Sequence, residues 1–206
     1  MFIDVVDLGV GNVKSIKNLL STLKLQTRSV SSPGELSSAT LILPGVGSAG
    51  PYMEKMRESG LAEAVTAHAL AGKNLIGICL GFQLLFDHSE EDGGVDGLGL
   101  IDGTVVRLGS NGDTRTHNGW RPMRFRRELL AEAGFSAYHG QTRKRVINGR
   151  VFYNHEYGVK CQEDDVSLMD IEGGCSAMAA KGNIVGMQFH PEKSQRTGLE
   201  LMAMLL

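Results

Sequence analysis

The chain has 206 residues, 42% of them hydrophobic and 21% charged, which is typical of a globular protein and predicts a single domain over 1–206. A formal net charge of −2 gives no electrostatic reason to expect nucleic acid or an anionic membrane as a partner. No apolar run reaches membrane-spanning length, and the first residues lack the features of a signal peptide, so we expect a cytoplasmic protein.

The first half of the chain alternates between strand and helix patterns. Strands show as short apolar runs, and helices show as apolar residues recurring at helical spacing or as a capping-box sequence with proline at the first helical position. The predicted elements are strands at 2–6, 40–43 and 74–78, and helices at 13–23, 32–35 and 61–71. This alternation predicts an α/β fold with a mostly parallel central sheet flanked by helices.

The pattern changes after residue 86. An acidic, glycine-rich stretch at 89–99 predicts a loop, and the Arg- and Lys-rich tract 121–150 is compatible with a helix and a loop. Because the chain as a whole is close to neutral, the positive charge of that tract indicates a solvated face and not a binding patch. The remaining predicted elements are strands at 102–108, 151–159, 175–180 and 184–189, a hairpin turn at 181–183, and a closing helix at 197–206. These add an antiparallel strand region in the C-terminal half.

Cysteine and glycine spacings exclude several kinds of site. Cys79, Cys161 and Cys175 are an odd number without a C-x-x-C pair, so neither a disulfide framework nor a zinc site is predicted, and we expect no metal. Gly9 and Gly11 match half of a dinucleotide-binding fingerprint, but no third glycine follows in register. We therefore expect no cofactor.

Gly77-Ile78-Cys79-Leu80-Gly81 joins a predicted strand to a predicted helix that runs toward Phe86. This is the cysteine version of the nucleophile elbow, in which a sharp turn strains the backbone of the nucleophile. The residues two before and two after it must then lack bulk. The start of a helix also favours the thiolate form of a cysteine. The alternative is a buried cysteine in an ordinary strand–helix turn.

His190 and Glu192 follow the last predicted strand, with Pro191 between them. Proline fixes one backbone dihedral, so both side chains are held rigidly at a strand end. A cysteine nucleophile needs a base, and the base needs a third group that orients it. Cys79, His190 and Glu192 could supply these roles, because α/β sites form at the ends of strands. An exposed His and Glu on a loop are the alternative.

Five other histidines could compete as the base, but none lies at a strand end with a carboxylate two residues on. They are His68, His88, His117, His139 and His155.

Pro44-Gly45-Val46-Gly47 follows an apolar strand and could form part of an oxyanion hole. A tetrahedral intermediate needs N–H donors aimed at its oxyanion. The N–H of Leu80, directly after the nucleophile, would be the first donor, and an N–H near Val46 the second. A simple strand-ending turn explains the same residues.

Together these motifs resemble class I glutamine amidotransferases, and more narrowly the glutaminase subunits of imidazole glycerol phosphate synthase. The resemblance spans nearly the whole chain and is strongest over 1–109 and 182–206. The stretches that carry the finer match lie at 7–15, 89–91, 97–100, 119–120 and 188–194.

The resemblance implies that Cys79 attacks the side-chain amide of glutamine and forms a thioester, while His190 moves protons and Glu192 orients it. Ammonia would pass to a (β/α)₈-barrel synthase subunit, in a heterodimer that makes imidazole glycerol phosphate and an aminoimidazole ribotide for histidine biosynthesis. It assigns glutamine binding to Gly45, Gly47, Gln83, Glu91, His155, Glu156 and Tyr157, and the partner interface to Asn12 and Trp120.

The chain departs from the family pattern at three places. Asn118 stands where methionine is usual, Glu156 stands where serine is usual, and the tract 121–150 matches poorly. Glu156 would bring a carboxylate near glutamine unless its side chain points away. Asn118 and the altered tract bear on the partner more than on the chemistry, since the region around Trp120 faces the synthase in the family.

Three functions therefore stay open. The chain is the glutaminase subunit for histidine biosynthesis, a paralogue that supplies ammonia to a related synthase such as one that amidinates a surface sugar, or a silent scaffold for a barrel. The complete set of Cys79, His190 and Glu192 argues against the scaffold.

Overall fold

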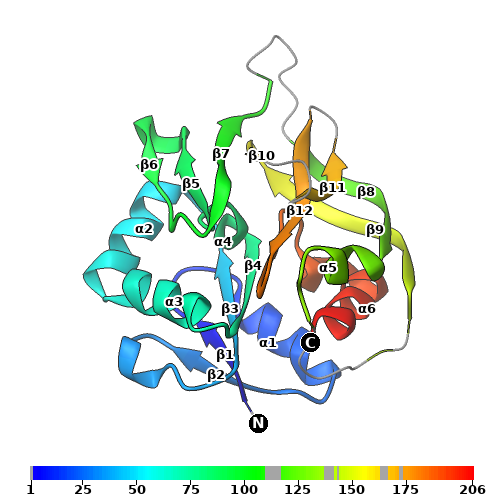
Figure 1. The fold of residues 1–206 in the computed structure, drawn as a ribbon, viewed down its shortest axis with the longest axis horizontal. Coiled ribbons are helices and arrows are strands. Elements are labelled where there is room, and N and C mark those ends of the chain that lie inside the picture. The colour runs from blue at the N-terminus through cyan, green and yellow to red at the C-terminus, as the bar shows by residue number, and fades with distance from the viewer. Residues whose placement is uncertain (1, 110–116, 137–141, 143, 163–166, 172–173) are drawn as a thin grey trace.

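The computed structural model describes residues 2–109, 117–136, 142, 144–162, 167–171 and 174–206 (Figure 1). The main sheet contains β1 (Phe2–Val6), β2 (Gln26–Val30), β3 (Thr40–Gly45), β4 (Asn74–Cys79), β5 (Phe86–Ser89), β6 (Val95–Asp96), β7 (Ile101–Arg107), β10 (Tyr157–Cys161), β11 (Ser167–Ile171), β12 (Cys175–Lys181) and β13 (Ile184–Met187). A separate antiparallel pair contains β8 (His117–Arg126) and β9 (Val146–His155). The α-helices are α1 (Val13–Thr22), α2 (Ala49–Glu58), α3 (Leu61–Leu70), α4 (Leu80–Gln83), α5 (Glu128–Glu132) and α6 (Gln195–Leu205), and the 3₁₀ turns are η1 (Pro33–Glu35), η2 (Glu91–Gly93) and η3 (Pro191–Lys193).

The described strands of the main sheet run in the order β2-β1-β3-β4-β13-β12-β10-β7-β5-β6, with β11 beside β12. The first five are mutually parallel. Antiparallel pairing begins where β12 meets β13 and continues through β10 and β7. The predicted fold class, a mostly parallel sheet with an antiparallel extension, is confirmed.

Two apolar layers cover the parallel strands. On one face, Ile3, Ile42 and Ile76 pack with apolar residues of α1, α5 and α6. On the other face, Leu41 and Leu75 pack with those of α2 and α3. Figure 1 shows these two groups of helices on opposite sides of the strands. Because successive strand residues point to opposite faces, a strand buried on both sides reads as a continuous apolar run. The end of β4, where Cys79 lies, is therefore supported from both sides.

Several predicted elements are confirmed to within a residue or two of their ends. These are the strands β1, β7 and β12, the helices α1, α3 and α6, and the hairpin between β12 and β13. The capping box before η1 is also present, with the Glu35 carboxylate accepting from the backbone N–H of Ser32 at 3.2 Å.

The helix after Cys79 is much shorter than predicted. It is the single turn α4, and Phe86 begins β5 instead of ending a helix. β5 pairs in parallel with β7, which draws the chain into the sheet. A short buried apolar run carries no periodicity that separates helix from strand, so the sequence could not show this.

The predicted strand at 151–159 was wrong as a single element. The chain turns at Glu156, so β9 lies in the two-stranded sheet and β10 in the main sheet. The tract 121–150 contains the end of β8, the short helix α5 and the start of β9, with 137–141 and 143 outside the described residues. Strand β2, helix α2 and the short elements β6 and η2 were not predicted.

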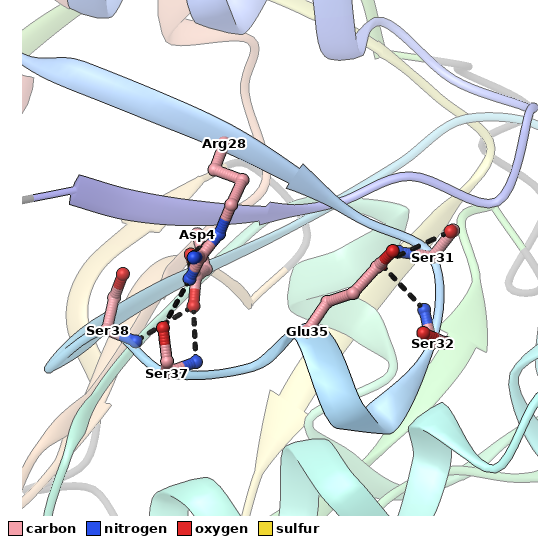
Figure 2. A network of polar contacts seen from close by, with 7 residues as sticks. All are labelled: Asp4, Arg28, Ser31, Ser32, Glu35, Ser37 and Ser38. Carbon is pink, nitrogen blue, oxygen red and sulfur yellow. Dashed lines mark hydrogen bonds and ion pairs between the residues drawn. The ribbon is translucent and has the colours of Figure 1, made fainter.

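A buried acidic side chain ties the first strands together (Figure 2). Asp4 of β1 is fully buried, and its Oδ1 lies 2.7 Å from Nη2 of Arg28 on β2. Its Oδ2 accepts from the backbone N–H groups of Ser37 and Ser38, each at 2.9 Å. Burial alone would raise the pKa of Asp4, but these hydrogen bonds outweigh it and the net shift is downward.

We expect Asp4→Asn to lower the free energy of unfolding by about 2–3 kcal/mol at pH 7, because it removes the charge that pairs with Arg28 and replaces one accepting oxygen with an NH₂ group that faces donors. A depressed carboxyl pKa stabilises the fold above the unfolded-state value, and this stabilisation is lost as pH falls through the folded-state pKa. Urea unfolding of the wild type and of Asp4→Asn should therefore show a difference in the free energy of unfolding that is largest at pH 7 and becomes smaller in acid. Asp102→Asn, which removes an exposed partner of Lys181, is the matched control. A constant difference across pH would contradict this role for Asp4.

Candidate active site

The backbone at Cys79 is strained as the elbow motif predicts. Cys79 ends β4 with φ 56° and ψ −110°, outside the regions that non-glycine residues ordinarily adopt. A Cβ added at Gly81 would lie 1.9 Å from the carbonyl oxygen of Leu43, and one at Gly77 would lie 2.8 Å from the carbonyl oxygen of Gly81. Gly81 therefore lets the turn pack against β3, and Gly77 lets α4 pack against β4. Cys79 lines the cavity at this turn.

Cys79 lies in the wall of a cavity of about 700 Å³ at the ends of the parallel strands. The lining includes the candidate residues Asn12, Val46, Gly47, Cys79, Leu80, Gln83, Glu91, His155, Glu156, Tyr157 and His190, and also Gly11, Asn118, Asn154 and Lys193. A volume of this size is ordinary for a small-molecule site. The structure thus brings most of the predicted residues together.

His190 is held between Cys79 and Glu192. Its Nδ1 lies 2.8 Å from Oε1 of Glu192, and both side chains are buried, at 2% and 0% exposed. This leaves Nε2 as the ring nitrogen that can act on Cys79, which lines the same cavity. The backbone of His190 is fixed as well, since its N–H donates to the carbonyl of Phe152 at 2.9 Å.

Electrostatics favour a protonated His190. Burial alone would lower its pKa, but the hydrogen bonds to Cys79 and Glu192 outweigh this and raise the pKa to about 9. A base of this kind can take the proton of the Cys79 thiol and keep it beside the sulfur. The arrangement can therefore supply a thiolate nucleophile and an adjacent acid.

Val46 and Gly47 lie on the wall with Leu80, as an oxyanion hole would require. Gly47 has φ +95° and open space around its missing Cβ. Gly45 is different: it is not in the cavity lining, and a Cβ there would lie 2.8 Å from the N of Gly81 and from Cβ of Leu80. Gly45 therefore packs against the elbow.

Of the predicted glutamine-binding residues, Gln83 and Glu91 are both engaged within the chain. Gln83 donates to the carbonyl of Tyr157 at 2.8 Å and to Oε1 of Gln188 at 3.0 Å. Glu91 accepts from the N–H of Ala49 at 3.1 Å, and its pKa is raised, chiefly by burial. Glu91 thereby joins the segment after β5 to the start of α2.

The turn between β9 and β10 lines the opposite wall. His155 Nδ1 lies 2.7 Å from the carbonyl of Tyr157, and its Nε2 is buried without a hydrogen-bond partner in the described chain. Burial lowers the pKa of His155 to about 4, so this ring is neutral beside a protonated His190. The carboxylate of Glu156 is exposed and lies 4.0 Å from Nη2 of Arg107. An exposed, paired carboxylate is compatible with glutamine in the cavity.

The two predicted interface residues differ in position. Asn12 lines the cavity and contacts Glu192, whereas Trp120 lies outside it on β8 and packs edge-on against Phe152 at 5.8 Å between ring centroids. Trp120 is half-buried on the two-stranded sheet.

The sequence interpretation gave Gln188 no role. This side chain is fully buried, and its Nε2 lies 4.0 Å from Sγ of Cys79. Its place one residue after β13 and two before His190 was the available signal.

The competing histidines have other surroundings. His68 is buried, with Nε2 3.1 Å from the carbonyl of Asn74, and His88 pairs with Asp96 at 3.2 Å. His117 packs against the His155 ring at 5.1 Å between centroids. His139 lies outside the described residues.

Comparison with known proteins identifies the family. A model of the class-I glutamine amidotransferase family matches residues 4–204. The chain belongs to the class I glutamine amidotransferase family.

Relatives of this amidotransferase with curated names include imidazole glycerol phosphate synthase subunit HisH of Geobacillus sp. (strain WCH70), which is 39% identical over 97% of this chain and 93% of the relative. The corresponding subunit of Moorella thermoacetica is 38% identical over 97% of this chain and 91% of the relative. The chloroplastic hisHF protein of Arabidopsis thaliana is 35% identical over 99% of this chain but only 34% of that longer protein.

Solved structures share the fold of this amidotransferase at lower identity. One described as a glutamine amidotransferase superposes with a TM-score of 0.73 at 18% identity, covering 98% of this chain and 96% of the other. PurLQS from Thermotoga maritima gives a TM-score of 0.68 at 20% identity, covering 99% and 97%. At such identities the likeness shows the fold alone.

The helices and polar side chains of the described residues bear on membranes and metals. No helix among them is long and apolar enough to cross a membrane. No group of three or more His, Cys, Asp or Glu side chains among them is arranged to hold a metal ion.

Proposed function

We propose that this chain is the glutaminase subunit of an imidazole glycerol phosphate synthase, acting as one domain in the cytoplasm. It hydrolyses glutamine to glutamate and ammonia and delivers the ammonia to a (β/α)₈-barrel synthase subunit in a heterodimer. The observation that carries the proposal is the strained Cys79 in the wall of a 700 Å³ cavity that His190 also lines, with Glu192 holding the His190 ring. The names of the relatives support the assignment to histidine biosynthesis.

The reaction begins when the Cys79 thiolate attacks the side-chain amide carbon of glutamine. The N–H groups of Leu80 and Val46 stabilise the oxyanion that forms. His190 gives its proton to the leaving nitrogen, so ammonia departs and a glutamyl thioester remains. Water then attacks the thioester, with His190 accepting its proton, and glutamate is released. Glu192 holds the imidazole throughout and stabilises its charged form.

Substrate binding follows from the same cavity. Glu91, Gln83 and the turn at 155–157 line its walls, so we assign them to glutamine recognition. Gly47 belongs with the oxyanion segment. Gly45 packs the start of that segment against the elbow at Leu80 and Gly81. Asn12 and Trp120 remain our candidates for the synthase-facing side.

The paralogue and scaffold alternatives are less well supported. The relatives at 35–39% identity that are named above all carry the name of imidazole glycerol phosphate synthase, which favours that partner over a sugar-amidinating one. A scaffold would not need the buried contact between His190 and Glu192.

Ammonium as a substitute for glutamine tests the supply role. The synthase subunit should turn over when mixed with this chain and glutamine, or alone with high ammonium, because the amide bond is broken in one subunit and the ring is formed in the other. The measurement is formation of imidazole glycerol phosphate under both conditions. A synthase subunit that stays inactive with ammonium would contradict ammonia supply by this chain.

A further inference from the structure

We propose that Asn12 is a positioning residue. Its side-chain amide fixes the Glu192 carboxylate, and the fixed carboxylate in turn orients the His190 ring. The proposal rests on the proposed function and deepens it, because it gives Asn12 a role in the reaction apart from any role at the partner surface. Asn12 lies between β1 and α1, far in sequence from both residues it would serve.

The contacts around Glu192 carry the proposal. Asn12 Nδ2 donates a hydrogen bond to Oε1 of Glu192, the same oxygen that lies 2.8 Å from Nδ1 of His190. Nδ2 also lies 3.4 Å from Nδ1 of His190. The side chains of Asn12 and His190 therefore converge on a single carboxylate oxygen of Glu192.

The hydrogen bond from Asn12 matters because the carboxylate that accepts it is buried. The side chain of Glu192 is 0% exposed, and its Oε2 has no hydrogen-bond partner in the described chain. A buried carboxylate with few donors is not fixed in one orientation. The amide of Asn12 holds the charged carboxylate toward the imidazole.

The orientation of the amide follows from the same geometry. Rotating it by 180° would place Oδ1 of Asn12 against a carboxylate oxygen, and two acceptors repel. Oδ1 instead faces a buried position without a partner among the described residues. That arrangement costs free energy, so the bond from Nδ2 to Glu192 must offset it.

Asn12 also does not make the capping hydrogen bond that is usual for an asparagine at the N-terminus of a helix. It is the N-cap of α1, where an asparagine side chain ordinarily accepts from a backbone N–H of the first turn. Asn12 makes no such side-chain bond. Its replacement should therefore cost the helix little, which lets an effect on the reaction be separated from an effect on stability.

The first test compares Asn12→Leu, which keeps a similar volume without the donor, with Asn18→Leu, an exposed asparagine of α1. Glutamine hydrolysis is measured at saturating synthase subunit. General acid–base catalysis contributes 10²–10⁴-fold, so imperfect orientation of His190 should lower kcat by about tenfold or more. KM should change by less than about twofold, because Asn12 acts through Glu192 and not on glutamine. Asn18→Leu should match the wild type.

Two further measurements separate an effect on the reaction from an effect on folding. Thermal unfolding reports whether Asn12→Leu folds, and Asn12→Asp, which keeps the shape but replaces the donor with a carboxylate, should also lower kcat. An unchanged kcat with a weaker Kd for the synthase subunit would overturn the proposal and leave Asn12 as an interface residue only.

A second test needs no turnover and no partner. Iodoacetamide alkylation of Cys79 follows the thiolate, which a protonated His190 stabilises. Among the described residues, the ionisable side chains that interact electrostatically with this imidazole are Cys79, Glu192 and His155. Asn12→Leu should shift the midpoint of the alkylation rate to higher pH, and an unshifted midpoint would overturn the proposal. A wild-type chain that hydrolyses no glutamine with its partner would contradict the proposed function instead, while the alkylation profile would still decide the role of Asn12.

Discussion

Cys79→Ala is expected to lower glutamine hydrolysis by at least about 10⁴-fold, because no other group can form the thioester. The fold should survive, since alanine is smaller than cysteine and keeps the same backbone. Hydrolysis is measured as glutamate released at saturating synthase subunit. In the same mixture, high ammonium should still support the synthase reaction.

Cys161→Ala is the matched control for this prediction. Cys161 lies on β10 and is half-buried, with Sγ 3.3 Å from the Ser176 hydroxyl. Its removal should leave glutamine hydrolysis unchanged. Substantial hydrolysis by Cys79→Ala, or an equal loss in Cys161→Ala, would contradict the assignment of Cys79 as nucleophile.

Gly47→Ala is expected to change the ratio of partner-stimulated to basal glutaminase activity by up to about a hundredfold, the value of one oxyanion-hole donor. Gly47 adopts φ +95° with open space around it, so an added methyl group strains this backbone conformation without a collision. The loop would then shift toward conformations in which the Val46 N–H is aimed differently. Basal and stimulated rates, with thermal unfolding, test this.

Gly45→Ala provides the contrast. Its methyl group would collide with the N of Gly81 and Cβ of Leu80, each 2.8 Å away, so it should lower stability by about 1–3 kcal/mol, as overpacking does. Basal and stimulated rates should fall together, because the elbow itself is displaced. If Gly47→Ala leaves the stimulation ratio unchanged while its melting temperature drops sharply, the loop is only structural.

Local spacing made the candidate nucleophile recognisable in the sequence. The glycines on either side of Cys79 are required by contacts within a few residues or with the neighbouring strand, and a short motif records such contacts directly. His190 and Glu192 could be predicted for the same reason, since a strand end and a proline fix both within three residues.

Contacts between distant parts of the chain were not visible. Asn12 and Glu192 are 180 residues apart, and no sequence motif near either residue predicts their hydrogen bond. Gln83 reaches Gln188 across 105 residues. Strand β5 depends likewise on pairing with β7, which overrides the local preference of the apolar run before it. The division of 151–159 between two sheets was hidden for the same reason.

Covalent labelling of Cys79 by an electrophilic glutamine analogue tests the central claim most directly. Burial raises the pKa of both Cys161 and Cys175, so these thiols stay protonated and unreactive near neutral pH. Peptide mass spectrometry of the chain with its synthase subunit should find one adduct, on Cys79, whose formation excess glutamine slows. An adduct on Cys161 or Cys175 at a comparable rate, or none on Cys79, would contradict a glutaminase built on this cysteine.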